Sequence, residues 1–100
     1  MREEEKVLHW ILAGTAGGYN RVRILNELLI KPQNTNILSK KLKLDFKTVQ
    51  HHLRVLEKNR LVTFKGGGGF GKVYFPSDMV ENNIDLIKEI KHNIENENII

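Results

Sequence analysis

Five glycines and a lysine between residues 66 and 72 come closest in this sequence to a phosphate-binding loop. Gly66 and Gly71 followed by Lys72 match most of the P-loop pattern, and Gly66, Gly68 and Gly71 match the dinucleotide-binding pattern. A P-loop needs Ser or Thr after the lysine to hold magnesium, and here Val73 follows. Both motifs also need a helix whose N-terminus holds the phosphate, whereas the segment KVYFP predicts a strand ended by proline. The glycine run therefore favours a flexible turn over a nucleotide site.

Histidines and carboxylates offer a second possible chemistry, which is metal binding. Glu89, His92 and Glu95 recur at i, i+3 and i+6 on a predicted helix, but a charged helix face explains this spacing equally well. His51 and His52 are adjacent on a helix, so their side chains diverge by ~100° and cannot easily chelate one metal. The sequence has no cysteine and no paired carboxylates beside a histidine in a context that would perturb their pKa. We therefore predict no metal site, no cofactor and no enzymatic activity.

The segment DFKTVQHHLRVLEKNRLV, residues 45–62, predicts a helix with an apolar side and a basic side, followed by a strand. Asp45 is a good N-cap, because its carboxylate can accept from the free N–H groups of the first turn. At ~100° per residue the apolar side collects Phe46, Val49, Leu53, Leu56 and the stem of Arg60. The opposite side collects Lys47, His51, Arg54 and Lys58, flanked by Thr48 and Gln50. A solvated helix face is the plain explanation, but positive charge mixed with hydrogen-bonding side chains also suits a nucleic acid.

Two more predicted helices precede this one. Residues 35–44 form a short helix with Thr35 as its cap, Ile37, Leu38 and Leu42 facing inward, and Lys40, Lys41 and Lys43 facing out. The break before residue 46 is only a few residues long, as a helix-turn-helix requires. Residues 20–30 form the other helix, with Asn20 as cap and Lys31-Pro32 as its stop.

Residues 62–75 predict a β-hairpin after the helix-turn-helix. Val62 to Lys65 and Lys72 to Phe75 each alternate apolar and polar side chains, and the glycine run joins them. A hairpin at this place is the wing of a winged-helix domain, and Lys65 and Lys72 flank its tip. The predicted fold class is therefore mainly α with a small β-hairpin, a winged helix-turn-helix with flanking N- and C-terminal helices.

Positive charge is concentrated in the middle of the chain. Residues 21–72 hold twelve Lys or Arg against three Asp or Glu, whereas residues 1–20 balance to −1 and residues 73–100 to −4. A merely soluble protein more often intersperses its charges. The uneven distribution is the one expected where phosphates are neutralised.

The two ends of the chain predict apolar helices. Residues 6–13 are apolar on most of their circumference, and residues 77–94 start with a cap at Ser77 and carry a stripe of isoleucines. Either both helices complete the core of one protomer, or they pack against their copies in a twofold dimer, which broad apolar faces favour. We expect one domain over residues 1–94, with 1–13 and 77–94 as dimerisation helices and 95–100 as a frayed tail. The predicted interface comprises Val7, Trp10, Ile11, Ile84, Ile87, Ile90 and Ile94.

The region from GTAGGYNRVRILNELL through TVQHHLRVLEKNRLV to KVYF, about residues 14–75, resembles the winged-helix transcriptional regulators of the ArsR-like superfamily, particularly small archaeal members. The resemblance implies a homodimeric DNA-binding regulator with Lys47, Thr48, Gln50, His51 and Arg54 facing the major groove. The Cys-x-Cys motif of the metal-sensing branch is absent, because the chain has no cysteine. The ligand of those sensors is therefore not carried over.

These observations predict a DNA-binding protein rather than an enzyme. The expected DNA-binding residues are Thr35, Lys40, Lys41, Lys47, Thr48, Gln50, His51, Arg54, Lys65 and Lys72. Lysines of the short helix and the wing would hold phosphates, and the recognition helix, about residues 46–60, would read base edges. A winged helix that binds RNA or coats DNA without sequence preference, and a protein-interaction module, remain alternatives. The acidic start MREEEKV, the lack of a long apolar stretch and the absence of cysteine favour a cytoplasmic protein.

Overall fold

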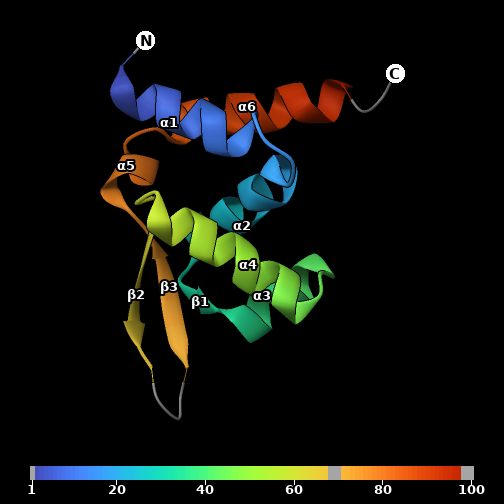
Figure 1. Ribbon diagram of the computed structural model, residues 1–100, viewed down its shortest axis with the longest axis vertical. Helices are drawn as coiled ribbons and strands as arrows, with labels where there is room; N and C mark the ends of the chain where they lie inside the picture. Colours follow the sequence, from blue (N-terminus) through green and yellow to red (C-terminus); the bar gives the residue numbers. More distant parts are fainter. Residues whose placement is uncertain (1, 68–70, 98–100) are drawn as a thin grey trace.

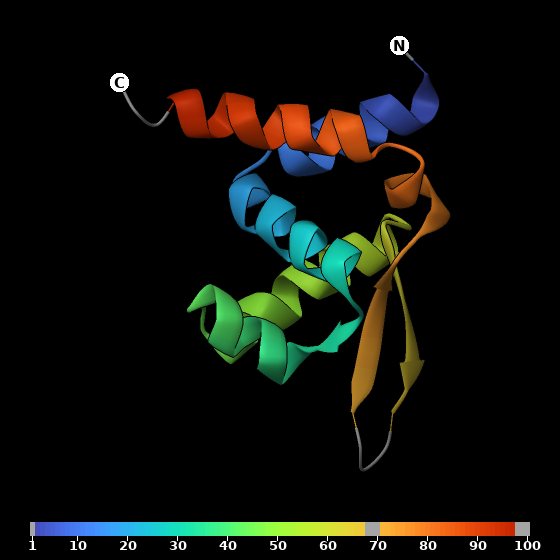
Figure 2. The same ribbon diagram turned by 180° about the vertical axis from the view of Figure 1, so that it is seen from behind.

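Six helices and three short strands are present in the computed structural model, which describes residues 2–67 and 71–97. Their order along the chain is α1 (Glu3–Leu12), α2 (Gly18–Ile30), β1 (Gln33–Asn34), α3 (Thr35–Leu42), α4 (Phe46–Lys58), β2 (Val62–Gly66), β3 (Lys72–Pro76), α5 (Asp78–Glu81) and α6 (Ile84–Glu97). α1 and α6 lie together at one end, α2 comes next, and α3, α4 and the hairpin form the other end (Figure 1). Figure 2 shows from behind that α3 and the hairpin point toward this same end. The predicted fold class, a winged helix-turn-helix, is confirmed.

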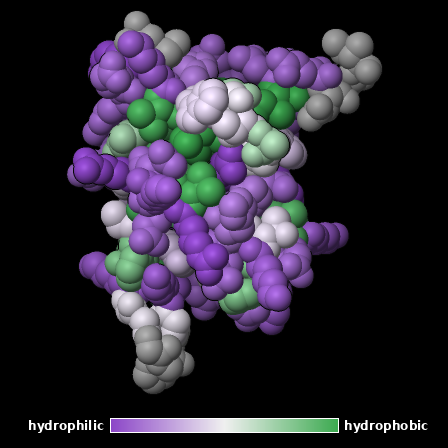
Figure 3. Space-filling view, viewed as in Figure 1, coloured by the Kyte–Doolittle hydropathy of each residue, from purple (hydrophilic) through white to green (hydrophobic). Residues whose placement is uncertain are grey.

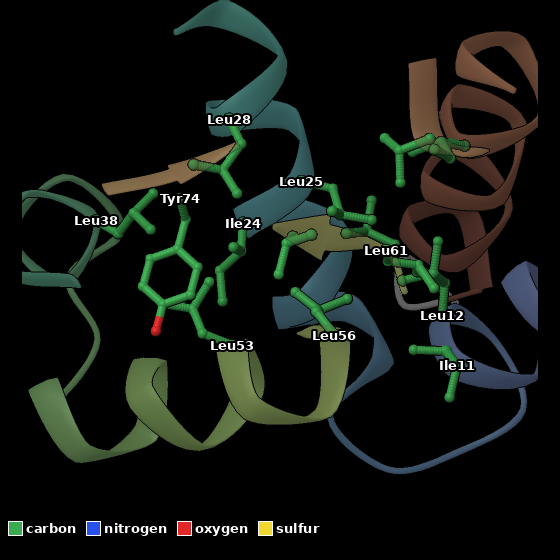
Figure 4. Close-up of a cluster of buried hydrophobic side chains, with 14 of the residues drawn as sticks. Ile11, Leu12, Ile24, Leu25, Leu28, Leu38, Leu53, Leu56, Leu61 and Tyr74 are labelled. Carbon is green, nitrogen blue, oxygen red and sulfur yellow. The ribbon is translucent and has the colours of Figure 1, made fainter. Parts of the chain in front are cut away.

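Leucines of α1, α2 and α4 meet in one core between the helices. Leu25 of α2, Leu53 and Leu56 of α4, and Leu12 of α1 have no exposed surface. Figure 4 shows the ring of Tyr74 from β3 lying beside Leu53, so the hairpin is anchored in the same core as the recognition helix. Because burial of a leucine contributes ~1.5–3 kcal/mol, this shared core fixes α4 and the hairpin relative to each other.

Strand β1 is an element that the sequence did not predict. The sheet has the order β1-β3-β2, and both pairs are antiparallel. Asn34 of β1 pairs with Val73 of β3, immediately before α3 begins. The start of α3 is therefore bonded to the wing.

Two predicted helix caps are wrong, and a third stands at the predicted position without a side-chain bond. Asn34 rather than Thr35 caps α3, and its Oδ1 accepts from the Ile37 N–H at 2.8 Å. Gly17, with φ of 84°, precedes α2, so Asn20 lies inside that helix. Ser77 stands at the start of α5, but its Oγ is buried without a hydrogen-bond partner among the described residues. α3 therefore begins one residue earlier than predicted, and α2 begins three residues earlier.

The predicted C-terminal helix over 77–94 is in fact two helices. α5 ends at Glu81, and the buried Asn83 donates from Nδ2 to the Met79 carbonyl at 2.7 Å. This side-chain bond satisfies a carbonyl at the end of α5 and allows the chain to turn into α6. α6 then continues to Glu97, beyond the predicted limit at Ile94. The other residues of the predicted tail, 98–100, lie outside the described residues, as do Gly68, Gly69 and Phe70 of the predicted wing tip.

Three of the seven residues of the predicted dimer interface are used inside the protomer. The side chains of Ile11, Ile87 and Ile90 are buried in the core of the single chain. They cannot also face a partner, because a buried helix face has no free surface. Trp10 is 63% exposed. Val7, Ile84 and Ile94 are half-buried at the edge of the core.

Candidate nucleic-acid interface

The turn between α3 and α4 sets the angle of the predicted recognition helix. Lys43 ends α3 in the left-handed conformation, with φ of 56°, and the Leu44 N–H donates to the Ser39 carbonyl at 3.1 Å. Asp45 then caps α4, as predicted, by accepting from the Lys47 N–H at 3.2 Å. This short turn between two packed helices is the helix-turn-helix expected from the sequence.

α4 presents a buried side and an exposed side. Val49, Leu53 and Leu56 are buried as predicted, and His52 joins them. Lys47, His51, Arg54 and Lys58 are exposed, and Thr48 and Gln50 are half-buried beside them. Two residues of the predicted apolar side are placed differently. Phe46 is 46% exposed, because it is the first residue of the helix, and Arg60 is exposed beyond the end of the helix, with φ of 64°.

A groove of ≈ 450 Å³ opens between α4, the start of α3 and the wing. From α4 it is lined by Phe46, Gln50, Arg54 and Glu57. From β1, α3 and the wing it is lined by Asn34, Thr35, Asn36, Gly67, Gly71, Lys72 and Tyr74. The pairing of Asn34 with Val73 explains why α3 and the wing form one wall. The groove brings together Thr35, Gln50, Arg54 and Lys72 from the predicted DNA-binding set.

The two predicted wing lysines lie on opposite faces of the hairpin. Lys72 Nζ is 4.0 Å from the centre of the Phe64 ring, and Lys65 Nζ is 5.4 Å from the centre of the Phe75 ring. Each ammonium is therefore held over an aromatic face, which restricts its motion without neutralising its charge. At the wing end, Gly66 has φ of 89°, and a Cβ there would approach the Gly71 carbonyl oxygen to 2.9 Å. Glycine at position 66 therefore lets the strands close.

The lysines of α3 differ from each other. Lys40 is exposed, whereas Lys41 Nζ is 3.6 Å from Glu27 Oε1. Arg23 of α2 donates to the Leu42 carbonyl at 2.7 Å and holds the last turn of α3. Lys40 is thus the α3 cation with the greater freedom to meet a phosphate.

The comparison with known families agrees with this geometry. Residues 19–63 match the family model described as bacterial regulatory protein, arsR family. They form an arsR-family regulator domain. A domain of this family binds DNA and regulates transcription, so the resemblance predicted from the sequence is confirmed over α2, α3 and α4. No curated protein matches the chain.

Beneath the exposed face of the arsR-family domain lies a buried arginine that the sequence analysis missed. Arg21 of α2 is 4% exposed, and it donates to the carbonyls of Ile11 and Ala16 at 3.0 and 3.1 Å and to the hydroxyl of Thr15. Its Nη1 is 3.3 Å from His52 Nδ1 on α4. Burial, together with the charges of Arg21 and His51, lowers the pKa of His52, so its ring is held neutral and accepts this bond. The network ties the end of α1 to α4. In the sequence, the burial of Arg21 was indicated by its position four residues before Leu25, which places both side chains on the same face of α2.

An acidic residue in the groove of the arsR-family domain was also missed. Glu57 is half-buried and lines the groove three residues after Arg54. Burial raises the pKa of the Tyr74 hydroxyl, and the charge of Glu57 raises it further while Arg54 acts in the opposite direction. The lining of the groove is therefore not uniformly positive. The carboxylate of Glu57 would repel a phosphate that entered the groove.

Two of the three candidate metal ligands on α6 are engaged with other groups. Glu95 Oε2 accepts from the Tyr19 hydroxyl at 3.2 Å, and His92 Nε2 is 3.0 Å from Asn96 Nδ2. Over residues 2–67 and 71–97 we find no group of three histidine or acidic side chains that could hold a metal ion. Among the same residues, no helix is long and apolar enough to cross a membrane.

Proposed function

We propose that this chain is a homodimeric transcriptional regulator that docks α4 in the major groove of DNA and the wing on the adjacent backbone. The observation that carries the proposal is the groove shared by α4, the start of α3 and the wing. Its walls hold base-reading side chains on α4 and a phosphate-binding cation, Lys72, on the wing. In a helix-turn-helix the second helix enters the major groove while the first crosses the backbone.

Base readout would come from the exposed side of α4. Gln50 can pair with adenine through two hydrogen bonds, and Arg54 can pair with guanine in the same way. Lys47 and His51 are exposed and Thr48 is half-buried on this helix, so they too could reach base edges. We therefore assign sequence recognition to α4.

Phosphate contacts would come from the elements that flank α4. Lys40 and Lys41 lie on α3 and Lys65 and Lys72 lie on the wing, so cations stand on both sides of the recognition helix. Thr35 at the start of α3 adds a hydroxyl at the groove wall. Such contacts fix the register of a protein on DNA but carry no sequence information directly.

Dimerisation would use the opposite end of the molecule. Trp10 is 63% exposed on α1, and Val7, Ile84 and Ile94 are half-buried on α1 and α6. Figure 3 shows hydrophobic residues gathered over α1 and between α1 and α4, whereas hydrophilic residues dominate the surface over α4. A twofold dimer through this end would present two α4 helices to two major grooves about one turn, ~34 Å, apart.

Selection of bound duplexes from a random DNA library tests the regulatory function. We expect a short inverted repeat, and Gln50→Ala and Arg54→Ala should each weaken binding to it by ~1–3 kcal/mol. Lys88→Ala, which removes an exposed charge on α6, is the matched control and should bind like wild type. Binding to every duplex with equal affinity would refute sequence-specific regulation.

Sedimentation of the free protein tests the dimer separately. Trp10→Ala should shift the chain toward the monomer, because it removes the largest exposed apolar side chain of α1. Ile30→Ala removes a 74% exposed side chain at the end of α2 and should leave the oligomeric state unchanged. A wild-type monomer at micromolar concentration would contradict the proposed dimer.

A further inference from the structure

An exposed phenylalanine stands at the start of the recognition helix. Among the described residues, Phe46 is the large hydrophobic side chain that α4 leaves exposed, at 46%. Single exposed apolar side chains are common on protein surfaces and need no function. The position of this one is more specific, because Phe46 lines the same groove as Gln50 and Arg54. It therefore belongs to the surface that would meet DNA.

We propose that Phe46 determines specificity by contacting the 5-methyl group of a thymine in the major groove. This inference rests on the proposed docking of α4 in that groove. Thymine carries the one methyl group among the four bases of the major groove, and apolar side chains contact it. Residues at the N-terminal end of a recognition helix are the ones that reach base edges. Phe46 is the first residue of α4, so its ring would stand at this end.

The spacing of the groove residues gives the relative position of this thymine. Phe46, Gln50 and Arg54 follow one another at intervals of four residues. Each interval advances ~6 Å along an α-helix, whereas B-DNA rises ~3.4 Å per base pair. Because a helix in the major groove is inclined to the duplex axis, successive side chains would meet base pairs at most about two steps apart. The thymine contacted by Phe46 would lie within about two base pairs of the base contacted by Gln50.

The geometry of α4 also makes this residue suitable for a clean test. The Asp45 cap orders the first turn through its bond to the Lys47 N–H. Phe46 is outside the cluster of buried core residues, so its removal should leave that core filled. Phe64 on β2 is another partly exposed phenylalanine, and its ring lies beside Lys72 on the wing rather than on α4. Phe64→Ala is therefore the control for the ratio of thymine to deoxyuridine affinity, which a weaker phosphate contact leaves unchanged.

The test uses the full chain and a duplex that carries its selected site. Each thymine is replaced, one at a time, by deoxyuridine, which lacks only the 5-methyl group. At one thymine of a half-site the replacement should weaken wild-type binding about fourfold, the value of one buried methyl-sized group. The loss should vanish in Phe46→Ala and persist in Phe64→Ala. Phe46→Leu keeps an apolar side chain, so most of the fourfold loss on deoxyuridine replacement should remain in this variant.

Distinct outcomes separate this inference from the function on which it rests. Wild-type protein that binds a defined site but tolerates every deoxyuridine replacement would overturn the inference alone. The same holds for a selected site without thymine, and for Phe46→Ala protein that keeps the fourfold loss. A chain that binds no duplex would overturn the proposed function and the inference together. Thermal unfolding of Phe46→Ala near the wild-type midpoint would show that its binding data come from a folded protein.

Discussion

Raising the salt concentration from 50 to 200 mM should weaken DNA binding by about four orders of magnitude. Lys40, Lys47, Lys65 and Lys72 are exposed, and none of them forms an ion pair with a carboxylate of the described residues. If each neutralises one phosphate, a dimer neutralises about eight. The slope of log affinity against log salt is then about −7, since each phosphate contributes about −0.9. A monomer bound through the same four lysines would give half this slope and lose about two orders of magnitude.

Fluorescence anisotropy with a labelled duplex at five salt concentrations measures this slope. In Lys72→Gln the slope should become shallower by about 1.8 for a dimer and by about 0.9 for a monomer. Lys41→Gln should change it less, because Lys41 Nζ is already 3.6 Å from Glu27 Oε1. Lys88→Gln on α6 is the control that should leave the slope unchanged. A wild-type slope shallower than −2, or a Lys72→Gln slope equal to wild type, would refute the electrostatic argument.

Three further predictions concern the charge of Glu57, the buried ring of His52, and the buried and exposed sides of α4. Glu57→Gln should strengthen binding to a duplex by up to about fivefold, because a like charge ~4 Å from a phosphate in water costs ~1 kcal/mol; equal affinities in a titration would contradict this. The pKa of His52 is lowered by burial first, so its stability contribution is full above pH ~6.5 and declines as the pH falls below it. Urea titrations at pH 7.5 and 5.5 measure this change. Between these two pH values the free energy of unfolding should fall more in wild type than in His52→Gln, and equal losses would contradict the predicted pH dependence. Leu53→Ala should cost ~2–5 kcal/mol of unfolding free energy in such titrations at pH 7.5, whereas Phe46→Ala should cost about 1 kcal/mol or less.

Local patterns in the sequence were sufficient for the elements that form the site. The basic and apolar sides of α4, its Asp45 cap and the alternation of β2 and β3 each depend on neighbouring residues, so they could be predicted. Strand β1 could not, because two residues have no recognisable period and exist as a strand only through pairing with β3. Phe46 fell at the edge of the apolar side, where helix periodicity cannot decide between burial and exposure. Arg21 was missed because its partners lie on other elements, five, ten and 31 residues away, and helix periodicity compares only positions within one helix.

The separation of charge along the molecule has a consequence for how the chain approaches DNA. The first turn of α1 carries Glu3, Glu4 and Glu5, and α6 carries a further set of carboxylates at the same end. Seven of the twelve Lys and Arg of residues 21–72 belong to α3, α4, β2 and β3, which lie toward the other end. A polyanion attracts one end and repels the other, so encounters with α4 and the wing leading are favoured before any contact forms. The acidic end also repels phosphates from the exposed Trp10, which is consistent with the dimer interface proposed above.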